Sequence, residues 1–190
     1  MRDPYETCPV YESEKILIRL IEAADADDLL SVYSDEQAVP FFNNDNCNGD
    51  DFHYTTPERM KSAVEFWQQA YREKWFVRWT IIDKQIGRAV GTIELFNRKA
   101  QDYFNDCGLL RLDLKSDHER EEWISEILSL IVPDAFKRFG CRMAATKVPP
   151  FASERRCAVE KAGFVRSEEV LIGGDDGKMY ADYYERRLNF

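Results

Sequence analysis

The stretch CGLLRLDLKSDHEREEWISEILSLIVPDAFKRFGCRMAATKV, residues 107–148, decides the fold of this chain. Its two ends, residues 107–114 and 141–148, are short apolar runs that predict strands. Between them, from about residue 119, apolar side chains recur at the spacing of a helix, at Trp123, Ile124, Ile127, Leu128 and Ile131. This order predicts two parallel strands with a crossover helix. We expect Pro133 to kink or split that helix, because proline has no backbone N–H donor.

Upstream of this unit, the chain predicts a strand, a short helix, a loop and a longer helix. Residues 15–21 alternate in polarity as a strand does, and residues 25–33 have helical spacing. Residues 34–56 are rich in Asn, Asp and Gly and predict a long loop. Thr56-Pro57 predicts a helix start, since a hydroxyl cap followed by proline is typical there, and the apolar face continues to Trp75.

The remaining segments predict two hairpins and one helix. Residues 76–96 form the first hairpin, and residues 164–188 form the second around a GGDDG turn. A helix at residues 153–162 lies between them in sequence and is ended by Gly163. We therefore predict a mixed α/β (α+β) fold in one domain spanning residues 1–190. Its sheet has about seven strands, mostly antiparallel, with helices on both faces.

Composition excludes several classes of function. The formal net charge is −9, which opposes the binding of nucleic acid phosphates. The five cysteines are scattered without a CxxC pair or a Cys/His cluster, so no metal site or disulfide framework is predicted. No apolar run reaches the ~20 residues of a membrane span. The first ten residues are polar and lack a signal core, so we expect a cytoplasmic protein.

Four stretches in this order resemble the GNAT superfamily of acetyltransferases: ILIRLIEAADADDLLSVYSD (16–35), IGRAVGTIELFN (86–97), the strand and helix up to DAFKRFG (107–140), and VEKAGF (159–164). Within the superfamily, the chain is similar to the ribosomal-protein alanine N-acetyltransferases. The resemblance implies transfer of an acetyl group from acetyl-CoA to a primary amine, on a protein N-terminus or a small molecule. It leaves the oligomeric state open, with a homodimer as one alternative.

The resemblance also implies roles for particular residues. In the family, acetyl-CoA lies in a V between the central strands, and backbone N–H groups near Leu112, Asp113 and Leu114 would hold the acetyl carbonyl. Glu94 would be the general base for the amine, or else a rim carboxylate in a salt bridge. Tyr180 stands near the place where family substrates enter, although alternating tyrosines on a strand more often pack in a core.

The loop that binds the coenzyme pyrophosphate in the family is altered in this chain. The family pattern Q/R-x-x-G-x-G/A falls on residues 117–122, where Arg120 and Glu122 replace the glycines. Ser116 and Glu119 have the spacing of a capping box. The acidic residues of this loop, Glu121 and Glu122 among them, would occupy the helix N-terminus that otherwise attracts phosphate. His118 flanks this loop as a candidate phosphate contact.

A second departure lies in the helix at residues 153–162. The family's Asn and Ser fall on Ala152 and Arg155, and the Tyr of other branches falls on Val159. Arg155 could bind coenzyme phosphates together with Arg120, Arg156 and Lys161, or these could be solvated surface charges.

Two functions therefore stay open. The first is an acetyl-CoA-dependent N-acyltransferase with an altered loop. The second is a catalytically silent relative that binds another ligand or a protein partner in the same cleft. Residues 44–49, with Phe41, Phe42, Phe52 and His53, would either cover a substrate pocket or form an ordinary surface loop.

Overall fold

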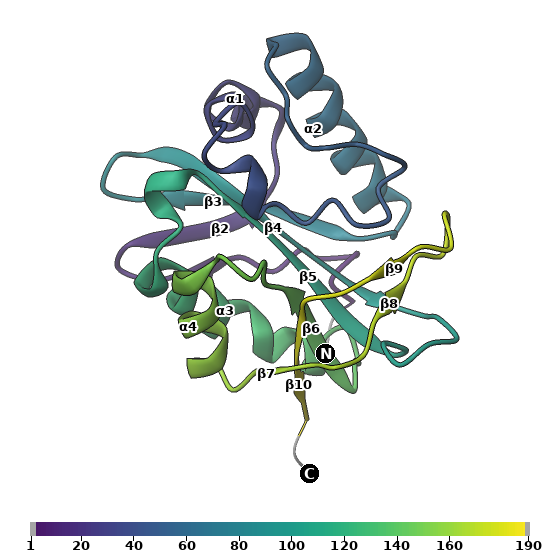
Figure 1. Ribbon diagram of the computed structural model, residues 1–190. Helices are drawn as coiled ribbons and strands as arrows, with labels where there is room; N and C mark the ends of the chain where they lie inside the picture. The colour runs from purple at the N-terminus through teal and green to yellow at the C-terminus, as the bar shows by residue number, and fades with distance from the viewer. Residues whose placement is uncertain (1–2, 189–190) are drawn as a thin grey trace.

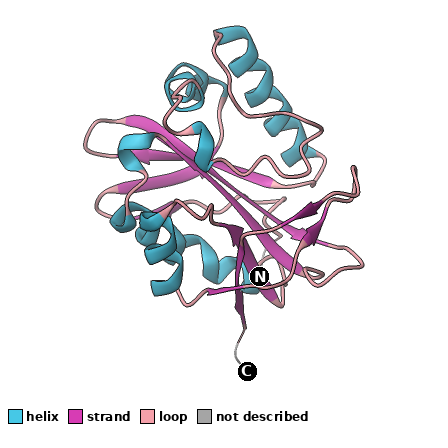
Figure 2. Ribbon diagram, in the orientation of Figure 1, coloured by secondary structure: helices cyan, strands magenta, loops and turns pink. Residues whose placement is uncertain are grey.

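The computed structural model describes residues 3–188, and among these residues eight strands form one sheet in the order β1-β2-β3-β4-β5-β6-β10-β7. Figure 1 and Figure 2 show this twisted sheet crossing the molecule between two groups of helices. The strands of this sheet are β1 (Tyr11–Glu12), β2 (Ile16–Leu20), β3 (Val77–Asp83), β4 (Arg88–Arg98), β5 (Cys107–Leu114), β6 (Met143–Lys147), β7 (Val165–Arg166) and β10 (Tyr183–Arg187). Strands β8 (Leu171–Ile172) and β9 (Met179–Tyr180) form a separate small hairpin.

The helices lie in pairs on opposite faces of the sheet. Helices α1 (Ala26–Tyr33) and α2 (Pro57–Arg72) cover one face, and α3 (Glu121–Lys137) and α4 (Ser153–Lys161) cover the other (Figure 1). The predicted mixed α/β fold with helices on both faces is confirmed. The expected C-terminal hairpin is divided, because β7 and β10 join the large sheet while β8 and β9 pair only with each other.

Local chemistry sets the helix ends where the sequence indicates them. The Thr56 hydroxyl accepts a hydrogen bond from the backbone N–H of Arg59 at 3.2 Å, as an N-cap does. Helix α4 is followed by Gly163 with φ +81°, a conformation that favours glycine.

Helix α3 is not split at Pro133, since it runs without interruption from Glu121 to Lys137, and the alternative of a kink stays a prediction. Proline in a helix interior costs about 3 kcal/mol relative to alanine. Here the apolar face of α3, including Ile127, Ile131 and Ala135, is fully buried against the sheet. Burying one isoleucine or leucine side chain contributes about 1.5–3 kcal/mol. Several such side chains together outweigh the cost of the proline.

Strands β5 and β6 are the parallel pair that the sequence predicts, and they separate at one end. They pair from Cys107 with Met143 to Leu110 with Thr146. Strand β5 then continues to Leu114 against β4, whereas β6 ends at Lys147. The resulting opening between β5 and β6 lies at the centre of the sheet.

The two faces of the central strands differ in chemistry. Toward α3, alternate residues of β4 and β5 are apolar and belong to one core cluster, for example Ile93, Leu95, Leu110 and Leu112. Toward α1 and α2, alternate residues of β3, β4 and β5 are polar yet buried: Arg78, Thr80, Thr92, Glu94, Arg111 and Asp113. Buried charges need compensation by partners, so this face is where a functional site is expected.

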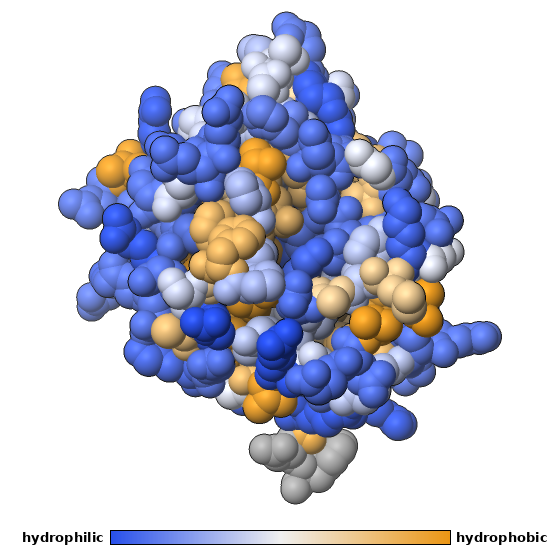
Figure 3. Space-filling model, in the orientation of Figure 1, coloured by the Kyte–Doolittle hydropathy of each residue, from blue (hydrophilic) through white to orange (hydrophobic). Residues whose placement is uncertain are grey.

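The surface in the view of Figure 1 is mostly hydrophilic, with separate apolar patches (Figure 3). Among residues 3–188, no helix combines the length and the apolar character that crossing a membrane would need.

Candidate functional site

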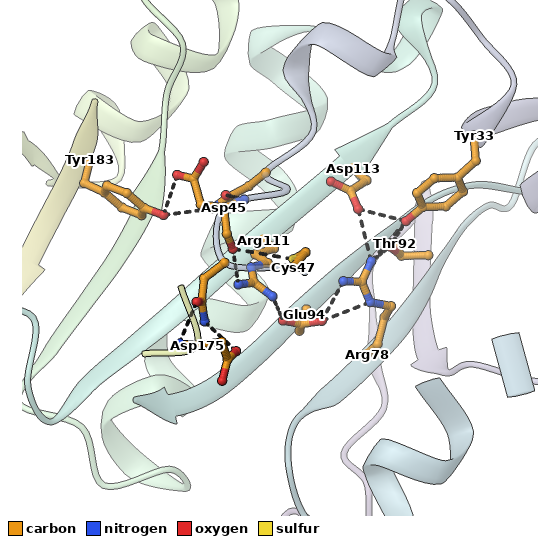
Figure 4. A network of polar contacts seen from close by, with 12 residues as sticks. Tyr33, Asp45, Cys47, Arg78, Thr92, Glu94, Arg111, Asp113, Asp175 and Tyr183 are labelled. Atoms are coloured by element: carbon orange, nitrogen blue, oxygen red, sulfur yellow. Dashed lines mark hydrogen bonds and ion pairs between the residues drawn. The ribbon is translucent and has the colours of Figure 1, made fainter. Parts of the chain in front are cut away.

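Arg78 on β3 is the centre of a buried polar network on the α1/α2 face (Figure 4). Its guanidinium is 1% exposed and lies 2.5 Å from Glu94 and 3.0 Å from Asp113. The same guanidinium donates to the hydroxyl of Tyr33 at 3.0 Å and to that of Thr92 at 3.1 Å. One cation therefore joins β3, β4, β5 and α1.

Glu94 on β4 lies between two arginines. Nη2 of Arg78 donates to its Oε2 at 2.5 Å, and Nη1 of Arg111 donates to its Oε1 at 3.0 Å. Glu94 is 1% exposed. To take a proton from an amine, one carboxylate oxygen would have to give up a guanidinium partner. The structure thus shows a buried salt bridge, and the role of Glu94 as a general base stays a prediction.

Asp45, in the loop between α1 and α2, crosses the opening between β5 and β6. Its backbone carbonyl accepts from Arg111 of β5 at 2.9 Å, and its carboxylate accepts from Lys147 of β6 at 2.6 Å. The other carboxylate oxygen accepts from the hydroxyl of Tyr183 on β10 at 3.0 Å. One loop residue thus ties together three strands at the point where the sheet separates (Figure 4).

Burial shifts the titration of this network. Burial raises the pKa of Asp113, although the charge of Arg78 opposes the shift. Burial and then the charge of Asp113 raise the pKa of Tyr33 well above its ordinary value. The Tyr33 hydroxyl therefore stays protonated and donates a hydrogen bond to Asp113 at 2.8 Å.

A pocket of about 760 Å³ opens beside this network, with Arg78, Glu94 and Arg111 among its lining residues. Its other walls are mainly aromatic: Phe52, Tyr54, Phe66, Trp67, Trp75, Phe76 and Phe96. Volume and lining are typical of a small-molecule site. Residues 46–48 and Phe52 line this pocket, so part of the loop that the sequence offered as a cover lies there. Phe41, Phe42 and His53 are not among its lining residues.

On the α3/α4 side, Arg155 and Glu119 form a buried ion pair near the same opening. Nε of Arg155 donates to Oε1 of Glu119 at 2.6 Å, and Nη2 donates to Oε2 at 2.7 Å. Nη1 of Arg155 donates to the backbone carbonyl of Phe41 at 3.0 Å. Arg155 therefore connects α4, the loop before α3 and the loop after α1, and it does not face solvent.

The predicted capping box of Ser116 and Glu119 is wrong. Residues Ser116–His118 form a 3-10 turn, and Arg120 is the N-cap of α3 without a side-chain cap. The carboxylate of Glu119 binds Arg155 in place of a backbone N–H group. A bidentate bond to a guanidinium is stronger than a bond between neutral groups, which explains the difference.

The N-terminus of α3 is partly occupied by a carboxylate of the protein itself. The backbone N–H of Glu121 donates to Oε2 of Glu154 on α4 at 2.9 Å. The Glu121 side chain pairs with Lys161. Arg120 is exposed and donates to the Asp117 carbonyl at 3.0 Å, and Arg156 is exposed as well. The basic patch of four residues, one of the two alternatives that the sequence left open, is therefore not assembled, because Arg155 is buried against Glu119 and Lys161 is paired with Glu121.

The other predicted residues lie apart from the pocket. His118 lies between Asp117 at 2.5 Å and Asp83 at 3.4 Å. The Tyr180 hydroxyl donates to Asp176 in its own hairpin at 2.5 Å. Glu122 is exposed on α3.

Leu112, Asp113 and Leu114 border the opening, in the part of β5 that extends beyond β6. Their assignment as the carbonyl clamp stays a prediction, as do the cofactor roles of the other residues.

No role was predicted from the sequence for Arg78, Arg111 and Lys147. Asp45 was included only as part of the loop at residues 44–49, and Tyr183 only as one of the alternating tyrosines near the place where family substrates enter. A signal for Arg78 and Arg111 was present in the strands. In VRWTIID and LRLDL, polar residues alternate with apolar ones, which places Arg78 and Arg111 on one face of the sheet. No local pattern indicates Asp45, which lies in a loop and meets its partners only in the folded chain.

Comparisons with known proteins agree with this architecture. A family model described as an acetyltransferase (GNAT) domain matches residues 15–165. A protein of Bacillus subtilis named uncharacterized N-acetyltransferase YoaA is 23% identical over 132 residues, which is 70% of this chain and 69% of the relative.

Solved structures with the same fold include a putative ribosomal-protein-serine acetyltransferase from Vibrio cholerae. It is 12% identical with a TM-score of 0.71, covering 98% of this chain and 100% of its own. A ribosomal-protein-S5-alanine acetyltransferase from Vibrio fischeri is 16% identical with a TM-score of 0.69, covering 94% of this chain and 96% of its own. At this identity the likeness concerns the fold alone.

Proposed function

This chain belongs to the GNAT acetyltransferase family, and from that premise we propose that it binds a ligand in the aromatic pocket without using acetyl-CoA as a cofactor. The observation that carries this proposal is the Arg155–Glu119 ion pair, with both side chains at most 3% exposed. It lies beside the opening of the sheet, where the family's coenzyme passes between the central strands. The charge of Arg155 acts on Asp113 of β5, so the pair lies near the part of β5 that borders the opening.

Acetyl-CoA, the cofactor that the family implies, does not fit the residues at the start of α3. A pyrophosphate there would meet the carboxylate of Glu154, which already accepts from the Glu121 N–H, and the carboxylates of Glu121 and Glu122. Two like charges about 4 Å apart near a protein surface repel by roughly 4 kcal/mol. A helix N-terminus stabilises an anion by about 0.3–2 kcal/mol. The carboxylates of Glu122 and Glu154 therefore act against an anion at this helix start, and the Glu154 carboxylate already uses one of its free N–H groups.

The α1/α2 side of the opening is closed as well. Asp45 binds Arg111, Lys147 and Tyr183, so the separated ends of β5 and β6 are tied together. The pocket of about 760 Å³ lies outside this closure and is open to a ligand from the α2 side. The chain therefore has the fold of the family, and the site that a ligand can reach is the aromatic pocket and not the opening between β5 and β6.

Calorimetric titration with acetyl-CoA tests this proposal. We expect no binding and no thermal shift for the wild type. A coenzyme at about 100 times its Kd would add about 2.7 kcal/mol of stability, which is easily detected. The variant Glu119→Gly with Arg155→Ser removes both charges of the pair and should gain coenzyme affinity. The exposed Glu160→Gln is the control. Tight binding by the wild type would overturn the proposal.

Acetyl transfer to a primary amine is the second candidate. The separation of β5 from β6, which the family uses for acetyl-CoA, and the position of Glu94 beside the pocket favour it. Two solved structures with this fold are named ribosomal-protein acetyltransferases, one of them as putative, so a protein N-terminus is the first substrate class to test. Under this candidate, the wild type releases CoA from acetyl-CoA in the presence of N-terminal peptides, and Glu94→Gln does not.

A further inference from the structure

The aromatic pocket combines rings with cations in a way that limits what it binds. The guanidinium of Arg78 lies 4.3 Å from the ring centre of Trp67, and that of Arg59 lies 4.2 Å from the ring centre of Tyr54. The guanidinium of Arg111 lies 5.6 Å from the ring centre of Phe96. Arg78 also lies within 6.0 Å of the rings of Phe52 and Phe76. Five of the aromatic walls therefore already have a protein cation on one face.

These cations act against a cationic ligand. An aromatic face attracts a cation through the negative charge of its π electrons. A ligand ammonium on these rings would lie close to the guanidinium groups of Arg59, Arg78 and Arg111, and like charges repel. The pocket is in this respect unlike an aromatic cage for an amine.

Carboxylates act against an anionic ligand. Asp50, Glu94 and Asp175 line the same pocket as the three arginines. Glu94 bridges Arg78 and Arg111, and Asp50 pairs with Arg59. Each of these arginines already has a carboxylate partner. A ligand carboxylate would have to share the arginine with that carboxylate, and the two negative charges would repel each other. A buried charge without its own partner is costly.

Two further lining rings, those of Phe66 and Trp75, have no cation over them among residues 3–188. Phe66 is 49% exposed and Trp75 is 54% exposed, and their ring centres lie 6.2 Å apart. Contiguous exposed apolar surface and aromatic lining are both typical of binding sites. Flat aromatic molecules stack on such rings without needing a charge.

The wall opposite these rings is held in place. Phe52 has φ 58°, a conformation that costs energy for a bulky residue and persists only where the surroundings impose it. Its backbone N–H donates to Asp50 at 2.9 Å. Asn46 donates to Asp175 at 3.0 Å and accepts from the Asp175 backbone N–H at 3.0 Å, which joins the loop to the β8–β9 hairpin. The pocket is thus formed before a ligand arrives.

We propose that this pocket binds an uncharged, flat aromatic molecule that packs against Phe66 and Trp75. The planes of these two rings are inclined by 53°, so the molecule stacks on one ring and contacts the other with its edge. The inference rests on the proposed function, because it names the chemical class that the pocket holds. It differs from an amine acceptor site in that the arginines behind the rings disfavour an ammonium group.

Three probes with the same ring system test whether the pocket prefers an uncharged ligand: 2-naphthamide is neutral, 2-naphthoate is an anion and 2-naphthylmethylamine is a cation. Calorimetry and ligand-observed NMR give their affinities for the full-length protein. We expect the neutral amide to bind, with the anion and the cation about tenfold weaker or more. Trp75→Ala and Phe66→Ala should each weaken amide binding about tenfold, since each removes one aromatic contact. Both side chains are exposed, so the fold should be retained.

The exposed Ile86 lies on the turn between β3 and β4, outside the pocket, and Ile86→Ala is the control that should bind like the wild type. Equal or tighter binding of the amine or the carboxylate would overturn the inference, as would failure of all three probes to bind. Amide binding that Trp75→Ala leaves unchanged would place the ligand elsewhere and also overturn it. Acetyl-CoA binding overturns only the proposed function, so the two failures are distinguishable.

Discussion

The backbones of Gly91 on β4 and Asp113 on β5 touch: a β-carbon added to Gly91 would lie 2.3 Å from the Asp113 carbonyl oxygen. The contact coincides with a β-bulge, because the register between β3 and β4 shifts at Ile81 and Ile82, opposite Gly91 and Ala89. The bulge lies near the end of β5 that borders the opening of the sheet. A glycine here therefore determines how closely the central strands approach.

We expect Gly91→Ala to destabilise the protein by roughly 1–3 kcal/mol, because the added methyl group forces two strands apart. Urea unfolding monitored by circular dichroism measures this change. Gly174 has open space around its backbone, and Gly174→Ala is the matched control, expected to stay within about 0.5 kcal/mol of the wild type. Equal stability of the two variants would show that the strands adjust freely.

Removing one partner of the Arg155–Glu119 pair should destabilise the fold strongly. Arg155→Met or Glu119→Leu leaves the other charge buried, at a cost of roughly 3–5 kcal/mol. The double variant Arg155→Met with Glu119→Leu leaves no buried charge and should recover much of that loss. A double-mutant cycle by chemical denaturation measures the coupling. Additive effects of the two sites would contradict a direct ion pair.

One cysteine should react with thiol reagents in the folded protein. Cys157 is exposed, whereas Cys107 and Cys141 are buried and Cys8 and Cys47 are half-buried. Burial raises the pKa of Cys47 to about 11, and burial raises those of Cys8 and Cys141 to about 12. Native titration with Ellman's reagent near neutral pH should modify one thiol per chain, and Cys157→Ser should abolish the reaction. Rapid modification of a second thiol would show that the fold opens locally.

Asp25 should contribute to stability at neutral pH and lose that contribution in acid. Burial opposes its ionisation, but hydrogen bonds from Arg19, Thr80 and the Glu22 backbone outweigh burial and lower its pKa. A folded pKa below the unfolded value of about 3.9 stabilises the fold above that pH. The contribution is lost as the pH falls through the lower, folded pKa.

The stability difference between the wild type and Asp25→Asn should therefore be largest near neutral pH and shrink below about pH 4. Urea unfolding over a pH series measures it. The exposed Asp27→Asn removes the same charge two residues away, in the first turn of α1, and is the control. A difference between wild type and Asp25→Asn that does not change with pH would mean that the substitution acts through packing.

The spacing of apolar residues was sufficient to predict most of the strands and helices. Strand β5 has the bounds that its sequence predicts, and the parallel pair with its crossover helix follows from residues 107–148. A split at Pro133, one of the two expected alternatives, is absent because burial of α3 outweighs the local preference of one residue. A prediction from local helix preference fails where tertiary packing contributes more free energy than that preference.

The candidate site was predictable only in part. The loss of the loop glycines and the acids at the start of α3 were visible in the sequence, since they depend on residues that are neighbours along the chain. The sequence also offered Arg155 as either a phosphate contact or a solvated charge, whereas the fold buries it against Glu119. Neither alternative included an internal partner.

The sequence by itself thus determined the order of strands and helices and the altered chemistry of the coenzyme loop, because both depend on neighbours along the chain. The tertiary structure alone decided which charges are paired. Asp45 meets Lys147, and Arg155 meets both Glu119 and the carbonyl of Phe41, across long stretches of chain. Such pairs form because buried charges must find partners, and the fold determines which partners lie within reach.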